Sequence, residues 1–177
     1  MSHDLDVTPD ATQRRSDPTV DVGLLILRVF VGLAIAAHGA QKLFGAFGGA
    51  GIEGTGQFFE SVGYSPGTTF AVIGGLTELG GGLLLALGLA APLAAAAIVG
   101  TLTGAYSVVQ AAGDADFFGG AGGPELELFY VVAAFALILT GPGRHALRIA
   151  KLDTPLIRSI ALVLAVAGGA AAILLRG

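Results

Sequence analysis

The first apolar run of the chain decides its fold: residues 22–44 have the sequence VGLLILRVFVGLAIAAHGAQKLF. A helix needs about 20 predominantly apolar residues to cross the hydrocarbon core of a bilayer, and this run is long enough. An arginine pair, Arg14-Arg15, precedes it as in some export signals. Because the run is long enough to span and contains Arg28, His38 and Lys42, it predicts a membrane-spanning helix rather than a cleaved signal.

Four further apolar segments follow, and the whole chain has the composition of a membrane protein. It is 54% hydrophobic and 12% charged, whereas an average soluble domain has about 25% charged residues. The fold class predicted is all-α, a polytopic membrane helical bundle with a four-helix core plus a fifth transmembrane helix. The four segments lie at residues 68–89, 93–112, 126–140 and 156–175.

The predicted domain organisation has three parts. Residues 1–21 are polar, lack a hydrophobic period and are predicted to form a disordered, dispensable cytoplasmic tail. Residues 22–152 form the four-helix membrane domain, and residues 153–177 contain the additional helix. The junction between the second and third segments, Gly88 to Pro92, is so short that these two helices should be antiparallel neighbours.

Charge and cysteine content exclude several classes of function. The formal net charge is -4, and the acidic residues of the tail leave no basic surface for nucleic acid. The chain has no cysteine, which excludes disulfides and cysteine-ligated zinc or iron–sulfur clusters. One intramembrane histidine is too few for a haem held between two histidines. We therefore expect no metal and no covalent cofactor.

The basic residues predict the orientation, because cytoplasmic loops of membrane proteins carry the excess of Lys and Arg. The loops at residues 45–67 and 113–125 have none, so they are predicted to face outward, where both could cover a pocket. A short interfacial helix is expected near residues 57–62, with Phe58, Phe59 and Tyr64 at headgroup level. The N-terminus is then cytoplasmic and the C-terminus external. The basic residues that set this orientation are Arg14, Arg15, Arg144, Arg148, Lys151 and Arg158.

Ionisable residues inside the spans are the candidate site, because each costs roughly 2.5–3.5 kcal/mol to insert and needs a partner or a purpose. At 100° per residue, Arg28 and Lys42 share a helical stripe with two glycines, and His38 flanks it. Glu78 lies between Gly74 and Gly82, a small-residue face that a neighbouring backbone or ligand could approach. The full candidate set, concentrated in the outer half of the bundle, is Arg28, His38, Lys42, Glu78, Gln110 and Glu125.

Two interpretations of Glu78 stay open at this point. As a structural group it would form a buried ion pair with Arg28 or His38 that fixes helix packing. As a functional group, with His38, Lys42 or Gln110 beside an apolar slot, it could hydrogen-bond the carbonyls of a quinone and exchange protons. The same set of side chains could also hold a lipid or a small solute.

Several motifs in order resemble the DoxX family of small bacterial integral membrane proteins. The first-helix pattern is Leu27-Arg28-Val29-Phe30-Val31-Gly32 followed by His38-Gly39-Ala40-Gln41-Lys42-Leu43. The later ones are Glu78-Leu79-Gly80-Gly81, Leu87-Gly88-Leu89, Gly122-Gly123-Pro124-Glu125 and Gly141-Pro142-Gly143-Arg144. The resemblance extends over residues 22–152. It departs from the family where an acidic residue often follows the closing turn and this chain has Arg148; the nearest acid is Asp153.

The resemblance implies a multi-pass protein of the bacterial plasma membrane that is associated with redox or oxidative-stress complexes, such as thiosulfate:quinone oxidoreductase. We expect a non-catalytic or quinone-contacting subunit, with the lipid bilayer and redox proteins as partners. The alternatives are a small-solute or lipid transporter and a purely structural membrane anchor. Whether the chain forms a homo-oligomer is left open by the sequence.

Overall fold

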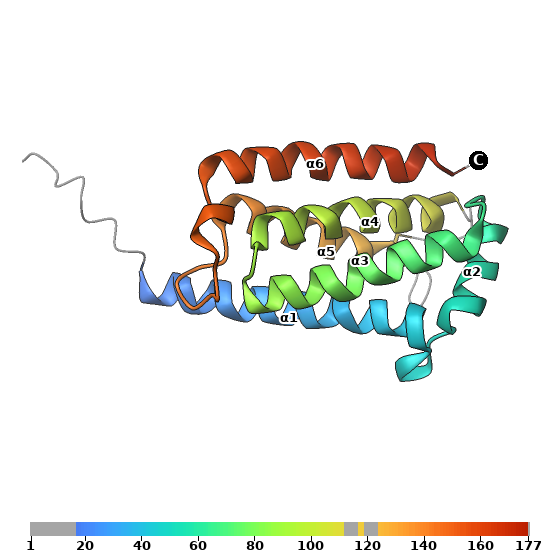
Figure 1. The fold of residues 1–177 in the computed structure, drawn as a ribbon, viewed down its shortest axis with the longest axis horizontal. Coiled ribbons are helices and arrows are strands. Elements are labelled where there is room, and N and C mark those ends of the chain that lie inside the picture. Colours follow the sequence, from blue (N-terminus) through green and yellow to red (C-terminus); the bar gives the residue numbers. More distant parts are fainter. Residues whose placement is uncertain (1–16, 112–116, 119–123, 177) are drawn as a thin grey trace, which may run out of the picture.

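The computed structural model describes residues 17–111, 117–118 and 124–176, and the described part is a bundle of long, nearly parallel helices (Figure 1). No strand occurs in these residues. The helices are α1 (Pro18–Phe44), α2 (Gly51–Ser61), α3 (Gly67–Leu87), α4 (Ala91–Ala111), α5 (Glu125–Thr140) and α6 (Pro155–Leu174), with short 3₁₀ turns at Ala46–Gly48 and Ala150–Leu152. The all-α bundle predicted from the sequence is confirmed.

The helical boundaries follow from turn and cap residues. The α1 helix ends at Gly45 and α3 at Gly88, both in the left-handed conformation that glycine adopts without strain. Pro155 begins α6, and the hydroxyl of Thr154 accepts a hydrogen bond from the Ile157 N–H. The junction after Gly88 places α3 and α4 side by side and antiparallel, as predicted.

The start of α1 corrects the predicted boundary of the polar tail. Asp17 caps the helix by accepting a hydrogen bond from the Thr19 N–H, and Pro18 occupies the first turn. Asp21 is buried and accepts a hydrogen bond from the backbone N–H of Arg144. Residues 17–21 are therefore part of the folded bundle, and the rest of the predicted tail lies outside the described residues.

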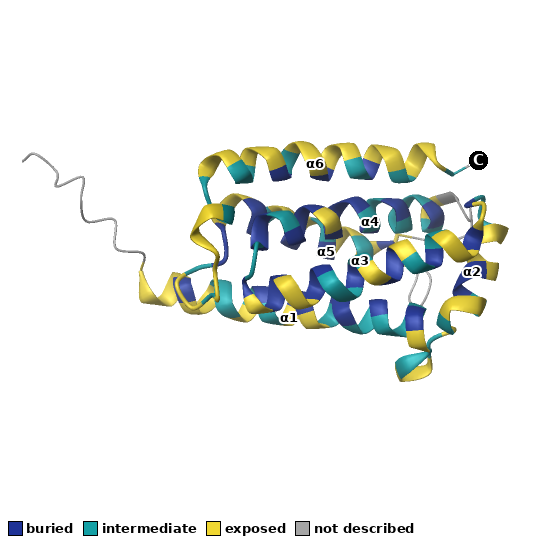
Figure 2. Ribbon diagram, viewed as in Figure 1, coloured by how far each residue is buried: buried dark blue, intermediate teal, exposed yellow. Residues whose placement is uncertain are grey.

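Four helices in the described part of the chain are long and apolar enough to cross a membrane: α1, α3, α4 and α6. The α5 helix has 16 residues and lies along the same bundle, connecting its two ends (Figure 1). The faces that point away from the bundle are apolar and exposed, above all on α6 (Figure 2). Phe30 and Val163, for example, are 65% and 68% exposed. Such surfaces are suited to lipid, so the chain is a multi-pass membrane protein in contact with the bilayer.

Glycine allows α1 and α3 to pack backbone to backbone. A Cβ added at Gly32 would lie 2.5 Å from the carbonyl oxygen of Gly82, and one added at Gly82 would lie 2.5 Å from that of Gly32. Arg28, Gly32 and Gly39 are all buried, which confirms that this stripe of α1 points into the bundle. Close backbone contact of this kind is a usual basis of helix association in lipid.

We expect Gly82→Ala to destabilise the bundle by about 1–3 kcal/mol, because the added methyl group forces two backbones apart. Gly80→Ala is the matched control, since nothing lies within 4 Å of a Cβ at Gly80. That control should gain about 0.5–1 kcal/mol from its higher helix propensity. Thermal unfolding in mild detergent measures both, and equal behaviour of the two variants would contradict the packing described.

The α2 helix and the turn after it cover the end of the bundle where α1 ends and α3 begins. This is the short helix predicted near residues 57–62, although it starts earlier, at Gly51. The carboxylate of Glu60 accepts hydrogen bonds from the Ser65 hydroxyl and the Gly67 N–H, and these bonds hold the pKa of Glu60 below its ordinary value. Tyr64 is 6% exposed, because its ring packs between Phe59 and Phe70 and so faces the protein rather than its surroundings.

Candidate functional site

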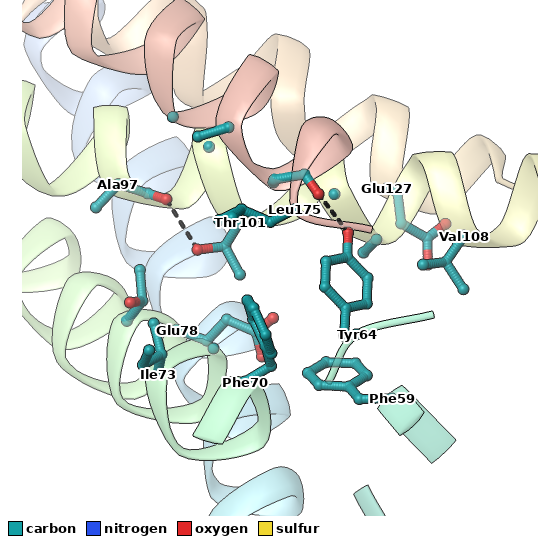
Figure 3. A pocket seen from close by; sticks show the side chains of 18 of the residues that line it. Phe59, Tyr64, Phe70, Ile73, Glu78, Ala97, Thr101, Val108, Glu127 and Leu175 are labelled. Carbon is teal, nitrogen blue, oxygen red and sulfur yellow. Dashed lines mark hydrogen bonds between the residues drawn. The ribbon is translucent and has the colours of Figure 1, made fainter. Parts of the chain in front are cut away.

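A cavity of about 680 Å³ lies between α3, α4 and α6 (Figure 3). The α4 helix packs against both α3 and α6 and supplies small residues to the lining, among them Ala97, Gly100 and Gly104. Its walls are Ile73, Gly74, Thr77 and Glu78 of α3 and Leu164, Gly168, Ala171, Ala172 and Leu175 at α6. We call this space the groove.

The end of the groove next to α2 is closed by the aromatic residues of the α2–α3 region. The Tyr64 hydroxyl donates a hydrogen bond of 2.7 Å to the carbonyl oxygen of Ala172, which connects this region to α6 (Figure 3). Phe58, Phe59 and Phe70 contribute the remaining aromatic lining at this end. The large side chains of Ile73 and Leu164, on opposite walls, are 56% and 51% exposed. The groove is therefore bordered by lipid-facing residues on its side and covered at its end.

A buried ion pair forms the most polar part of the groove. The ammonium of Lys42 donates hydrogen bonds of 2.5 Å to both carboxylate oxygens of Glu78. The Glu78 side chain is 1% exposed, whereas that of Lys42 is 24% exposed. Both residues line the groove, so the pair is available to a bound molecule.

The partner of Glu78 differs from the prediction, which named Arg28 or His38. The α1 and α3 helices pack with Gly39 against the backbone of Leu79, and the Cβ of Lys42 lies at Gly75. The long stem of Lys42 can then extend about one helical turn along α3 to reach Glu78. The ring of His38 instead meets Tyr130 of α5.

Arg28 is a structural residue remote from the groove lining. Its guanidinium is buried and donates hydrogen bonds to the backbone carbonyls of Ala86, Pro142 and His145. These carbonyls belong to the end of α3 and to the turn after α5. Arg28 thus joins three segments at the cytoplasmic end predicted for the bundle, and the dipoles of these carbonyls stabilise its charge.

The other predicted site residues also lie away from the groove. The Nδ1 atom of His38 lies 3.0 Å from the Gln41 side-chain oxygen, and its ring meets that of Tyr130 edge-on at 6.3 Å. Gln110 is exposed and donates to the Tyr106 hydroxyl. Glu125 is exposed at the start of α5. Of the six predicted residues, the groove brings together Lys42 and Glu78.

Glu127 was missed by the sequence analysis as a site residue, although it is two positions from the predicted Glu125. It lines the groove from α5, and its Oε2 atom is buried with no hydrogen-bond partner in the described part of the chain (Figure 3). The sequence of α5 after these residues is apolar and has no polar face. It therefore does not show which of the two glutamates, Glu125 or Glu127, points into the bundle. A buried oxygen without a partner is a common sign that another group binds there.

The region before and at the start of α6 contains a second cluster of charges, none of which lines the groove. Asp153 accepts two hydrogen bonds from Arg158, of 3.1 and 2.7 Å, and lies 3.5 Å from Arg148. Arg158 also donates to the carbonyl of Leu139. These contacts hold the connection between α5 and α6, and they give Asp153 a structural role.

The groove has the chemistry of a site for a lipophilic molecule with a polar head. Its surface is mainly apolar, its ionisable groups are the Lys42–Glu78 pair and Glu127, and its neutral polar groups are the hydroxyls of Tyr64, Thr77 and Thr101. Among the described residues, no group of histidine, aspartate and glutamate side chains could hold a metal ion. The arrangement can bind, orient and exchange protons with a ligand.

Comparison with known proteins agrees with this architecture. A family model described as DoxX matches residues 23–111, from the first turns of α1 to the end of α4. A curated protein of Bacillus subtilis (strain 168), named "Putative oxidoreductase CatD", is 36% identical over 121 residues, which cover 68% of this chain and 81% of that protein. No solved structure matches the chain. The extent of both sequence matches shows that the chain belongs to the DoxX family.

Proposed function

We propose that the chain is a quinone-binding membrane subunit of a redox complex in which partner proteins supply the electron carriers. The observation that carries this proposal is the groove itself: an apolar space beside lipid, with the Lys42–Glu78 pair in its wall. A quinone is an apolar ring with two polar oxygens and a lipid-soluble tail, which fits such a lining. The relative CatD, whose name describes an oxidoreductase, supports a connection with redox chemistry.

The route of entry follows from the way the groove is closed. The Tyr64–Ala172 hydrogen bond and the aromatic residues block the end next to α2, whereas exposed apolar side chains border the groove on the lipid side. A ligand dissolved in the bilayer can reach Lys42 by passing between α3 and α6. A water-soluble solute would have to cross this apolar border, which favours the quinone over a small polar substrate.

Filling the groove should abolish quinone binding. Ala97 is exposed on the groove floor, so Ala97→Phe places a ring inside the groove without displacing a core residue. Val163→Phe, on the exposed lipid face of α6, is the matched control. We expect at least a tenfold loss of affinity for a short-chain benzoquinone in nanodiscs for Ala97→Phe and none for Val163→Phe. Equal affinity in both variants would contradict the assignment, and a tightly bound phospholipid lost only from Ala97→Phe would favour a lipid-binding function instead.

We also propose that the N-terminus is cytoplasmic and the C-terminus external, from the positions of Lys and Arg. The absence of native cysteine makes labelling direct. An impermeant thiol reagent should label Phe118→Cys in intact cells and spare Leu147→Cys, since both residues are exposed and lie in the connections before and after α5, at opposite ends of that helix. Permeabilised cells, in which both should react, are the control. The reverse pattern in intact cells would show the opposite orientation.

A further inference from the structure

We propose that the groove prefers the reduced, hydroxyl-bearing form of its ligand, a hydroquinone, over the oxidised quinone, and that Glu127 causes this preference. This inference rests on the proposed function and specifies which redox form is bound. The reason lies in the balance of hydrogen-bond donors and acceptors in the lining.

The donors of the groove are mostly committed to protein oxygens. The Tyr64 hydroxyl donates to Ala172, and the Thr101 hydroxyl donates to Ala97 at 3.1 Å. The Lys42 ammonium donates to both oxygens of Glu78, which leaves one of its three hydrogens for a ligand. The groove can therefore offer a ligand oxygen one charged donor from Lys42 and a neutral donor from the Thr77 hydroxyl, which also lines it.

An acceptor, by contrast, is left without a partner. The buried Oε2 atom of Glu127 has no hydrogen bond among the described residues, and an ionised carboxylate is only an acceptor. A buried polar atom without a partner carries the full cost of its lost hydration. A ligand that brings a hydroxyl hydrogen to this oxygen removes that cost, whereas a ligand that brings only another acceptor does not.

The two redox forms of a quinone differ in this respect. Both forms have oxygens that can accept a hydrogen from Lys42. Only the hydroquinone has hydroxyl groups that can also donate to Glu127. A hydrogen bond to a charged group is worth enough to change affinity by about tenfold or more, so the hydroquinone should bind at least tenfold tighter than the quinone.

The test compares three ligands with one ring and one short isoprenoid chain: a benzoquinone, its hydroquinone, and the dimethyl ether of the hydroquinone. The ether keeps both oxygens but has no donor. Equilibrium dialysis against the full chain in nanodiscs, without oxygen, should give at least tenfold tighter binding of the hydroquinone than of the other two. If the wild-type chain binds the hydroquinone and its dimethyl ether with similar affinity, the inference is wrong.

Variants then assign the effect to Glu127. Glu127→Gln introduces an amide that can donate as well as accept, so the ratio between hydroquinone and quinone should fall to about threefold or less. Glu125→Gln, on the exposed side of the same helix turn, should keep the wild-type ratio. A full preference that persists in Glu127→Gln would overturn the role of Glu127. If the wild-type chain binds the two forms equally, only this inference fails; if it binds none of the three ligands, the proposed function fails with it.

Discussion

Lys42→Met should destabilise the bundle by about 3–5 kcal/mol, because it leaves the carboxylate of Glu78 buried without its cation. Glu78 is 1% exposed and cannot turn to water, whereas the side chain of Lys42 is 24% exposed and keeps some contact with its surroundings. The buried carboxylate of Glu78 therefore depends on the ion pair more than the ammonium of Lys42 does. Glu78→Gln, which keeps the shape and one acceptor oxygen, should cost less than Lys42→Met.

The double variant separates a structural pair from a ligand-binding pair. Lys42→Met combined with Glu78→Leu replaces two charges by apolar groups of similar size, and such replacements in other proteins are neutral or stabilising. We expect the double variant to recover most of the stability lost in Lys42→Met and still fail to bind quinone. Thermal unfolding in detergent and ligand binding should be measured on the same samples. No recovery in the double variant would show that the two residues do not act as a pair.

Arg28→Leu should destabilise the bundle by at least about 3 kcal/mol, because three backbone carbonyls, two of them in buried hydrogen bonds, lose a charged donor together. The carbonyls lie on segments that are far apart in the sequence, so their loss should loosen the contact between α1, the end of α3 and the turn after α5. Arg28→Lys should restore only part of the stability, since an ammonium lacks the planar fork that reaches all three oxygens.

Arg144→Ala is the control for the effect of charge at this end of the bundle. The side chain of Arg144 is 66% exposed, and its Nε atom lies 4.0 Å from Asp21. The Arg144 side chain is solvated, its contact with the buried Asp21 is long, and Asp21 keeps the hydrogen bond from the backbone N–H of residue 144, so this variant should lose less stability than Arg28→Leu. A loss in Arg144→Ala as large as in Arg28→Leu would indicate that total positive charge, rather than the carbonyl contacts, holds this end together.

The helices themselves were predictable from the sequence, because each apolar run is long and is bounded by glycine or proline. The predicted segments at residues 68–89 and 156–175 became Gly67–Leu87 and Pro155–Leu174. The start of α1 was also accessible, since Asp17 followed by Pro18 is a usual pattern of a helix N-terminus. The residues around it are also polar and acidic, so residues 17–21 were assigned to the polar tail.

The pairing of side chains was less predictable, because it depends on how two helices cross and on how far a flexible side chain extends. The spacing of Arg28 and Lys42 showed that they share a face of α1. It did not show which of the two side chains contacts Glu78. The contact between Gly39 and Leu79 fixes how α1 and α3 align, and the long side chain of Lys42 then spans the remaining distance to Glu78. Arg28 was expected to need an acidic partner, but backbone carbonyls at chain ends supply its hydrogen bonds instead.

The groove could be predicted only in part. Gly74, Glu78 and Gly82 were recognised as a face with room around the carboxylate, and the structure places Gly74 and Glu78 in the groove wall. The contribution of α6 and the covering role of Tyr64 depend on contacts over about a hundred residues of sequence, such as the Tyr64–Ala172 hydrogen bond. No local pattern in the chain carries that information.

The central claim is that a quinone-type ligand occupies the groove between α3, α4 and α6, and photo-crosslinking tests it most directly. A short-chain quinone with an azido group on its ring should be activated on the full chain in nanodiscs, and the labelled peptides identified by mass spectrometry. We expect the label on groove residues such as Thr77, Ala97 and Gly168, and its loss when unlabelled quinone is added in excess. Label spread over lipid-facing residues such as Phe30 and Val163, and unaffected by the competitor, would contradict the claim.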